Sequence, residues 1–246
     1  ISMKNENIII FSSIDWSDNW QIHQKLAKSL CNDNKVLFVE NTGTRNPKIS
    51  DYKRILKRIK IWLKSIVGFK ELEKNLTLYS PITLPFPYNS FFLFINNILI
   101  GQPINKWMQI SKFNNPIIIN FLPTPLITRQ INKINSKVVI YYCADNMIDS
   151  TIKKPKLKKW EDKFIKYSDH IIVTANTLKE KVLKINNKVN KVPCGVDTNL
   201  FYYKKYRPLP LDIQNIKKPI IGYIGAISDV LDMDLLESII KKFTNI

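Results

Sequence analysis

Cysteine and glycine are both scarce in this chain of 246 residues. The three cysteines, Cys31, Cys143 and Cys194, have no Cys-x-x-Cys spacing and no neighbouring histidine, so the sequence indicates neither a disulfide framework nor a zinc site. None of the six glycines lies in the segment from Ser12 to Trp16, which follows the first expected strand. A dinucleotide-binding domain needs a glycine-rich turn at that point, which argues against a nicotinamide-dependent dehydrogenase.

Long apolar runs are also missing. No run approaches the ~20 residues that span a bilayer. Met3 and Lys4 lead directly into a short apolar stretch, Ile8 to Phe11, without the pattern of a signal peptide. These absences predict a cytoplasmic protein.

Positive charge is abundant, because 38 Lys and Arg stand against 20 Asp and Glu, for a formal net charge of +18. Such a surplus arises from a compositional bias toward Lys, Ile and Asn, or from an anionic partner such as a membrane surface, a nucleotide or a nucleic acid. The cations are clustered, with ten basic against three acidic residues over 45–74 and seven against two over 151–166. This clustering favours an anionic partner.

Short apolar runs alternate with longer stretches of helical periodicity. Most runs are rich in Ile and Val and nearly continuous, as in parallel strands buried on both faces. The alternation predicts an α/β fold with a Rossmann-like, doubly wound parallel sheet. The capping-box pair Thr177 and Glu180 predicts a helix that starts at Thr177. The expected strands are 7–11, 35–39, 76–79, 116–121, 137–142 and 170–174, and the expected helices are 20–32, 52–67, 91–112, 126–132, 156–167 and 178–185.

The pattern changes after residue 200. Residues 201–218 lose periodicity and carry two prolines, which is typical of a linker. An apolar strand at 219–224 and a helix from about Met233 then look like the first βα unit of a second Rossmann-type domain. A lone βα unit cannot build a core of its own. We therefore expect an N-terminal domain over 3–200 and the truncated start of a second domain over 219–246.

Four stretches form an ordered set that covers most of the chain. They are Phe11–Trp20 with His23 and Gln24, Val36–Gly43, Tyr141–Asp145 followed by Trp160, Glu161 and Tyr167–Thr174, and Pro193–Phe201. The set resembles the bacterial GT-B glycosyltransferases, especially the family 4-like enzymes of cell-surface polysaccharide assembly, including the teichuronic-acid biosynthesis type. The resemblance implies the acceptor-side, N-terminal half of a GT-B fold. It also implies a transferase that uses a nucleotide sugar, a UDP- or GDP-sugar, with no other cofactor and no metal.

The donor side departs from that family. The family usually binds the nucleotide sugar in its C-terminal domain, often with a Glu-x7-Glu stretch, and that region is not in this sequence. The loop after the second domain's first strand commonly carries an Arg and a Lys, whereas residues 225–232 hold neither. Contact with the diphosphate would then fall to backbone amides at Gly225 and Ala226 or to groups outside this sequence. For Gly195 the alternative is ordinary turn chemistry. The donor-binding candidates are Gly195, Val196, Asp197, Gly225 and Ala226.

Polar residues follow two of the expected strands. Asp145 comes after the strand at 137–142, at the carboxyl edge where ligands bind in open α/β sheets. It is the candidate catalytic base for an acceptor hydroxyl, and the alternative is an Asp that opens a turn with Asn146. Asn41 follows the strand at 35–39 and is an acceptor-binding candidate, with a simple glycine-containing turn as the alternative.

Asp15, Trp16, Trp20 and His23 follow the first expected strand. Sugars present flat apolar faces and hydroxyl edges, so indole rings beside an acid and an imidazole suggest an acceptor subsite. The alternative is a helix start with Asp15 or Ser17 as N-cap and the rings packed on the sheet.

The segment 53–67 places its apolar residues on one helical face and carries six cations and no acid over 53–64. A tryptophan at the border of such a face suits an interfacial helix on an anionic membrane. The alternative is a surface helix that packs its apolar stripe on the domain. The membrane-contact candidates are Lys53, Arg54, Lys57, Arg58, Trp62 and Lys64.

The sequence thus predicts a hexosyltransferase of cell-envelope biosynthesis, peripheral at the cytoplasmic face of the membrane. It would move a sugar from a nucleoside-diphosphate donor to a lipid-linked or polysaccharide acceptor. Residues 1–246 alone are expected to be inactive, because catalysis needs donor and acceptor held together. The alternative is a non-catalytic basic module that docks on an anionic membrane or another polyanion. No nucleic-acid partner is expected, because no such motif occurs and the cations accompany an apolar face.

Overall fold

The computed structural model describes residues 3–43, 68–84, 86–146, 154–202, 208, 210–216, 220–225, 227 and 231–243. The chain divides into two compact units, Ile1–Gly195 and Val196–Ile246, which we describe separately. The strands of the first unit are β1 (Asn7–Phe11), β2 (Lys35–Val39), β3 (Phe69–Glu73), β4 (Leu76–Tyr79), β5 (Ile117–Asn120), β6 (Val138–Cys143), β7 (His170–Val173) and β8 (Val189–Lys191). Its described helices are α1 (Ile22–Leu30), α3 (Ser90–Ile110), α4 (Pro125–Ile131), α5 (Lys154–Tyr167) and α6 (Asn176–Leu183).

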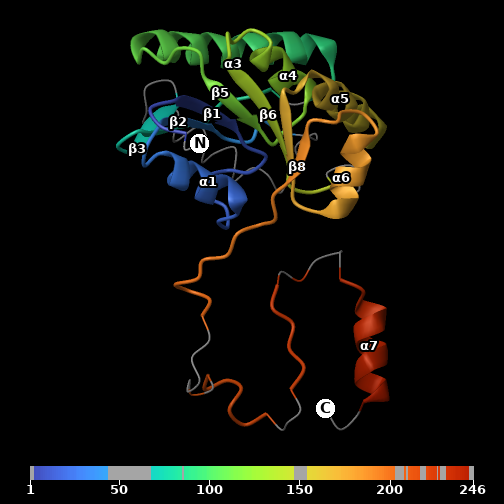
Figure 1. The fold of residues 1–246 in the computed structure, drawn as a ribbon. Helices are drawn as coiled ribbons and strands as arrows, with labels where there is room; N and C mark the ends of the chain where they lie inside the picture. Colours follow the sequence, from blue (N-terminus) through green and yellow to red (C-terminus); the bar gives the residue numbers. More distant parts are fainter. Residues whose placement is uncertain are drawn as a thin grey trace. The chain divides into compact units, whose positions relative to one another are not determined.

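The strands of the first unit form one eight-stranded sheet in the order β3-β4-β2-β1-β5-β6-β7-β8 (Figure 1). Every neighbouring pair is parallel except β3 with β4. The predicted α/β fold with a Rossmann-like sheet is confirmed. The expected strands at 7–11, 35–39 and 76–79 match β1, β2 and β4 residue for residue.

The two faces of the sheet are buried in separate apolar clusters. Ile8 and Ile10 of β1 face the cluster that includes Ala27 of α1. Ile9 and Phe11 face the other cluster, which includes residues of α3, α4, α5 and α6. Because both faces of β1 are covered, its side chains are apolar at every position rather than at alternate ones.

The strand order reverses at β1. The chain passes from β1 through α1 to β2 on one side, and β5 later pairs with β1 on the other side. Helices α1 and α3 cover opposite faces, since their buried residues belong to different clusters. This arrangement creates a topological switch point at the carboxyl ends of β1 and β5, where open α/β sheets bind ligands.

Two local predictions were wrong. Helix α6 begins at Asn176 and its N-cap is Ala175, without a side-chain hydrogen bond, so Thr177 lies inside the first turn and does not cap the helix. Strand β3 was not predicted, because its sequence Phe-Lys-Glu-Leu-Glu is mostly charged. It pairs only with β4, at the edge of the sheet, where charged side chains remain in water.

In the second unit, residues 220–224 form no strand, so the strand predicted at 219–224 is wrong over those residues. The predicted helix is α7 (Met233–Lys242), and the Asp232 side chain caps it by accepting the Leu235 N–H at 2.8 Å. The helix ends at Lys242 and buries no residue. A strand needs a neighbour for its backbone hydrogen bonds, and an isolated βα unit supplies none. The expected helix at 52–67 lies outside the described residues, and no described helix could cross a membrane.

Candidate active site

The carboxyl ends of three neighbouring strands meet at the switch point. The parallel register aligns Phe11 of β1 with Asn120 of β5, and Asn120 with Tyr141 of β6. The segments that follow these strands therefore lie side by side. They enclose a small cavity of about 20 Å³, roughly the space that one water molecule needs. It is lined by Ser13, His23, Phe121, Tyr141, Tyr142, Cys143, Ala144 and Asp145.

His23 and Asp145 are the predicted site residues that share this cavity. They lie 122 positions apart in the chain. His23 is on α1, 3% exposed, with its ring centroid 3.9 Å from that of Phe121. Asp145 is exposed at the mouth. The arrangement places an imidazole inside the carboxyl edge and a carboxylate at its opening.

The hydrogen bonds of His23 determine its tautomer. The Ser12 hydroxyl donates its single proton to the Ile14 carbonyl at 2.9 Å, so at 3.2 Å it can only accept from the Nδ1–H of His23. Nε2 then carries the lone pair, 3.5 Å from the Ser13 hydroxyl. Burial lowers the pKa of His23 to about 4, because the imidazolium would lose its hydration. At neutral pH the ring is therefore uncharged, with a hydrogen-bond acceptor at Nε2.

Three contacts stabilise the turn that carries Asp145. Thr174 donates its hydroxyl to the Ala144 carbonyl at 2.6 Å. The Cys143 thiol lies 3.7 Å from the Asp145 carbonyl, and Lys181 donates to the Asn146 side chain at 3.3 Å. These contacts involve the backbone of Asp145 and its neighbours, so its carboxylate is positioned while it stays exposed.

A buried polar network that was not predicted lies behind this turn. The Tyr141 hydroxyl donates to Glu161 Oε1 at 2.8 Å, and Lys181 contacts Glu161 Oε2 at 2.8 Å. Burial, followed by the neighbouring Cys143 and Glu161, holds the pKa of Tyr141 well above its usual range. Burial also raises the pKa of Cys143 to about 11, so this thiol stays protonated. The sequence carried a signal, because Glu161 falls on the apolar stripe of α5 with Leu157 and Phe164, all at most 1% exposed.

The other acceptor candidates lie beside β1 and β2. Asp15 is 6% exposed, and the half-buried Trp16 ring packs between Trp20 at 5.6 Å and Phe38 at 5.0 Å. The Trp16 N–H donates to the buried carboxylate of Glu40 at 2.7 Å, which ties the loop after β1 to the end of β2. Trp20 remains half exposed.

The proposed caps of α1 were wrong, and Asn41 has a local role. The N-cap of α1 is Gln21, whose N–H donates to the Gln24 side chain at 3.0 Å, so neither Asp15 nor Ser17 caps the helix. The Asn41 side chain accepts the Gly43 N–H at 2.7 Å. Gly43 has a φ of 87°, a conformation that favours glycine, so Asn41 stabilises a glycine turn at the end of β2.

The donor-side candidates are exposed and are described unit by unit. Gly195 has no positive φ, so backbone conformation does not require glycine there. Asp197 accepts the N–H groups of Asn199 and Leu200 at 3.1 and 3.3 Å, which makes it a turn residue. Val196 is 65% exposed, and Gly225 is exposed. The remaining candidates, Ala226 and the membrane-contact residues Lys53, Arg54, Lys57, Arg58, Trp62 and Lys64, lie outside the described residues.

Among the described residues, no group of three His, Cys, Asp or Glu side chains is placed to hold a metal ion.

Comparison with known proteins establishes the fold. Neither a protein-family model nor a curated protein sequence matches this chain. Sucrose-phosphate synthase from Thermosynechococcus elongatus matches with a TM-score of 0.51 and 12% identity over 80% of this chain and 50% of that chain. A shorter chain of the same protein matches with a TM-score of 0.46 and 12% identity over 77% of this chain and 90% of that chain. The match thus spans half the length of the longer synthase chain, and the shared feature is the Rossmann-like fold.

Proposed function

We propose that this protein is a glycosyltransferase that moves a sugar from a nucleoside-diphosphate donor, a UDP- or GDP-sugar, to an acceptor hydroxyl. The observation that carries the proposal is the pairing of His23 and Asp145 around one cavity at the switch point. Support also comes from the likeness in fold to sucrose-phosphate synthase, a GT-B glycosyltransferase. The charge and the fold alone would also suit a basic binding module, but such a module has no need of this pair.

The two side chains suit different parts of the acceptor reaction. An attacking hydroxyl must lose its proton as its bond to the sugar forms, and the exposed Asp145 carboxylate is the proposed general base. Burial keeps the His23 ring uncharged at neutral pH, so its Nε2 can accept a hydrogen bond and orient a hydroxyl. Trp16, Trp20 and Asp15 are proposed to contact the acceptor on the β1–β2 side, and Asn41 through the turn that it stabilises.

The nucleotide-sugar donor needs residues that contact its diphosphate. We assign this role to Gly195, Val196 and Asp197 and to the backbone amides at Gly225 and Ala226, with residues 201–218 as the linker between domains. Backbone N–H groups bind phosphate oxygens without a bound cation.

The acceptor is proposed to be lipid-linked or a polysaccharide, in cell-envelope glycan synthesis at the cytoplasmic face of the membrane. Support comes from the segment 53–67, which combines an apolar helical stripe with six cations over 53–64. Anionic headgroups would attract such a segment and bring the enzyme to its acceptor.

A screen of nucleotide sugars on the full-length protein, read as release of the nucleoside diphosphate, tests the proposal. We expect release with one UDP- or GDP-sugar, and its loss in Asp145→Asn. Asp33→Asn, another exposed aspartate, is the matched control and keeps full activity. Failure of every nucleotide sugar to bind, measured by calorimetry, would leave the basic binding module as the better account.

A further inference from the structure

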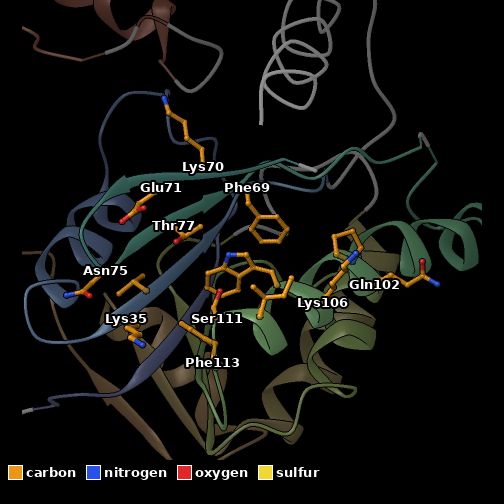
Figure 2. Close-up of a pocket in the computed structure, with 14 residues that line it drawn as sticks. Lys35, Phe69, Lys70, Glu71, Asn75, Thr77, Gln102, Lys106, Ser111 and Phe113 are labelled. Atoms are coloured by element: carbon orange, nitrogen blue, oxygen red, sulfur yellow. The ribbon is translucent and has the colours of Figure 1, made fainter. Parts of the chain in front are cut away.

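The cavity that His23 and Asp145 share is much smaller than a sugar ring. Its volume of about 20 Å³ has room for one water molecule or one hydroxyl group. A larger concavity of about 710 Å³ lies on the α3 side of the sheet and reaches Lys35 and Asn75, at the amino ends of β2 and β4 (Figure 2). Among the described residues, none lines both spaces. An acceptor in the larger space would not meet Asp145, so the small cavity decides which part of the acceptor is held.

The small cavity offers a hydrogen-bonding position at His23 Nε2. The ring is 3% exposed, and Nε2 carries the lone pair because Nδ1–H is directed to Ser12. The Ser13 hydroxyl lies 3.5 Å from Nε2, beyond the roughly 2.7–3.2 Å of ordinary hydrogen bonds. Buried polar atoms in folded proteins normally have a full hydrogen-bond partner. Since Ser13 and His23 both line the cavity, a group that binds there can become the close partner of Nε2.

A hydroxyl group in this cavity can use both of its hydrogen-bonding functions. Its O–H would donate to His23 Nε2, and its oxygen would accept a hydrogen bond from the Ser13 hydroxyl. This held hydroxyl is not the one that reacts, because neither a sugar ring nor its anomeric carbon fits beside it in about 20 Å³. The new bond to the transferred sugar must therefore form at the mouth of the cavity, where Asp145 is exposed.

We propose that the acceptor is a vicinal diol, with one hydroxyl held between Ser13 and His23 while the hydroxyl on the adjacent carbon reacts at Asp145. This inference rests on the proposed sugar-transfer function. The carbon that bears the held hydroxyl lies in the mouth, so the hydroxyl on the next carbon is the one brought to Asp145. Its oxygen bonds to the anomeric carbon of the nucleotide sugar as its proton passes to the Asp145 carboxylate. The nucleoside diphosphate leaves with the electron pair of its former bond to that carbon.

The diol requirement predicts which hydroxyl of an acceptor sugar receives the transferred sugar. Every ring hydroxyl of a glucopyranoside, galactopyranoside or mannopyranoside has another hydroxyl on an adjacent carbon. The exocyclic hydroxymethyl group does not, because the neighbouring ring carbon carries the ring oxygen. The new linkage should therefore form on a ring hydroxyl and not on the hydroxymethyl group.

Transfer by the full-length protein to the methyl glycosides of these three sugars tests the diol requirement. Of the monodeoxy analogues that lack a hydroxyl beside the new linkage, one should lose roughly 10–100-fold in kcat/KM, because Nε2 then stays buried without a close partner. In Ser13→Ala this loss should shrink about fivefold. The matched control is Ser136→Ala, another half-buried serine, before β6 at the amino edge of the sheet, which should keep the full loss. Linkage to the hydroxymethyl group, or equal transfer to every monodeoxy analogue, would overturn the diol and leave sugar transfer established.

Nuclear magnetic resonance of isotope-labelled histidine tests the held hydroxyl without any turnover. The chain has two histidines, so the ring nitrogens of His23 and His170 give separate signals. A saturating methyl glycoside should shift the Nε2 signal of His23, its critical monodeoxy analogue should not, and the signals of the exposed His170 should stay in place. A shift without sugar transfer would contradict the proposed reaction and support the diol site. The absence of a shift with all three methyl glycosides would overturn the diol site.

Discussion

The ammonium group of Lys181 lies 2.8 Å from Glu161 Oε2, and the Glu161 side chain is 1% exposed. The second oxygen of Glu161 accepts a hydrogen bond from Tyr141, so both oxygens of this buried carboxylate have a partner. Lys181 also reaches Asn146, next to the proposed base Asp145. The ion pair joins α6 to α5, and the Tyr141 hydrogen bond joins α5 to β6, next to the turn that carries Asp145.

Removing Lys181 should be much more harmful than removing an exposed lysine. Lys181→Met leaves the Glu161 carboxylate buried without its cation, which should cost about 3 kcal/mol of unfolding free energy and lower Tm by roughly 6–12 °C. The double variant Glu161→Gln/Lys181→Met should recover part of this loss. Lys158→Met, which removes a 56%-exposed lysine from an ion pair on α5, is the control and should stay within about 0.5 kcal/mol. Equal melting temperatures for Lys181→Met and Lys158→Met would contradict the structural role of the buried pair.

Asp145→Asn in the full-length protein should lower kcat by about 10²–10⁴-fold, the usual contribution of a general base. Asp145 is exposed, so the variant should keep its melting temperature. Steady-state kinetics beside a thermal melt separate the two effects. A folded and fully active variant would mean that Asp145 is only a turn residue.

The buried His23 should make stability depend on pH. Its pKa falls from 6.5 in the unfolded chain to about 4 in the folded protein, so the unfolded state binds more protons between these values. The stabilisation is fully present above pH 6.5 and is lost as pH falls toward 4. Between pH 7 and pH 5 the unfolding free energy should drop by about 2 kcal/mol on account of this residue.

Urea unfolding at pH 7 and at pH 5 gives the unfolding free energy at each pH, and the difference between the two values is the predicted drop. His23→Gln should show a smaller drop than the unaltered protein, because it removes the titrating group. The other histidine of the chain, His170, is exposed, so His170→Gln should keep the full drop. Identical pH dependence in His23→Gln and the unaltered protein would rule out a buried, neutral His23.

Binding to liposomes should require anionic lipid and weaken with salt if residues 53–67 contact a membrane. Each cation near such a surface contributes about 1 kcal/mol, and salt screens it over a Debye length. Replacing Lys57, Arg58 and Lys64 with Glu should abolish co-sedimentation, and Trp62→Ala should weaken it more modestly.

The same change of charge elsewhere provides the control for membrane binding. Lys156, Lys159 and Lys166 are exposed cations of α5, and replacing them with Glu should leave co-sedimentation in place if the contact is specific to 53–67. Loss of binding in both triple variants would indicate attraction by net charge alone. Binding that ignores salt and lipid charge would argue against the membrane proposal.

The parallel core of the fold could be predicted from sequence, because its strands are apolar on both faces. Ile8, Ile9 and Ile10 are all 0% exposed, so an uninterrupted apolar run is the correct signature of β1. The edge strand β3 was not predicted from the sequence. Most of its residues are charged, because a strand at the edge of a sheet can leave charged side chains in water. The strand predicted at 219–224 has the right composition, but residues 220–224 form no strand in the structure.

The candidate site was predictable only in part. The position of Asp145 after an apolar strand indicated the carboxyl edge of the sheet. Nothing in the sequence distinguished Asn41, which stabilises a glycine turn, from a ligand-binding residue. The choice of Gln21 over Asp15 as the cap of α1 was also unpredictable, because it depends on where the chain leaves the loop held by Glu40.

Composition and periodicity by themselves determined that this chain builds a doubly wound α/β sheet, because burial on one or both faces dictates where apolar residues recur along the chain. The tertiary structure alone decided that His23 and Asp145 share a cavity, through the alignment of Phe11 with Asn120 and of Asn120 with Tyr141. It also decided that Glu161 is buried between Tyr141 and Lys181. Hydrogen bonds between strands and ion pairs between helices join residues far apart in the chain, and no local pattern records which distant residue is the partner.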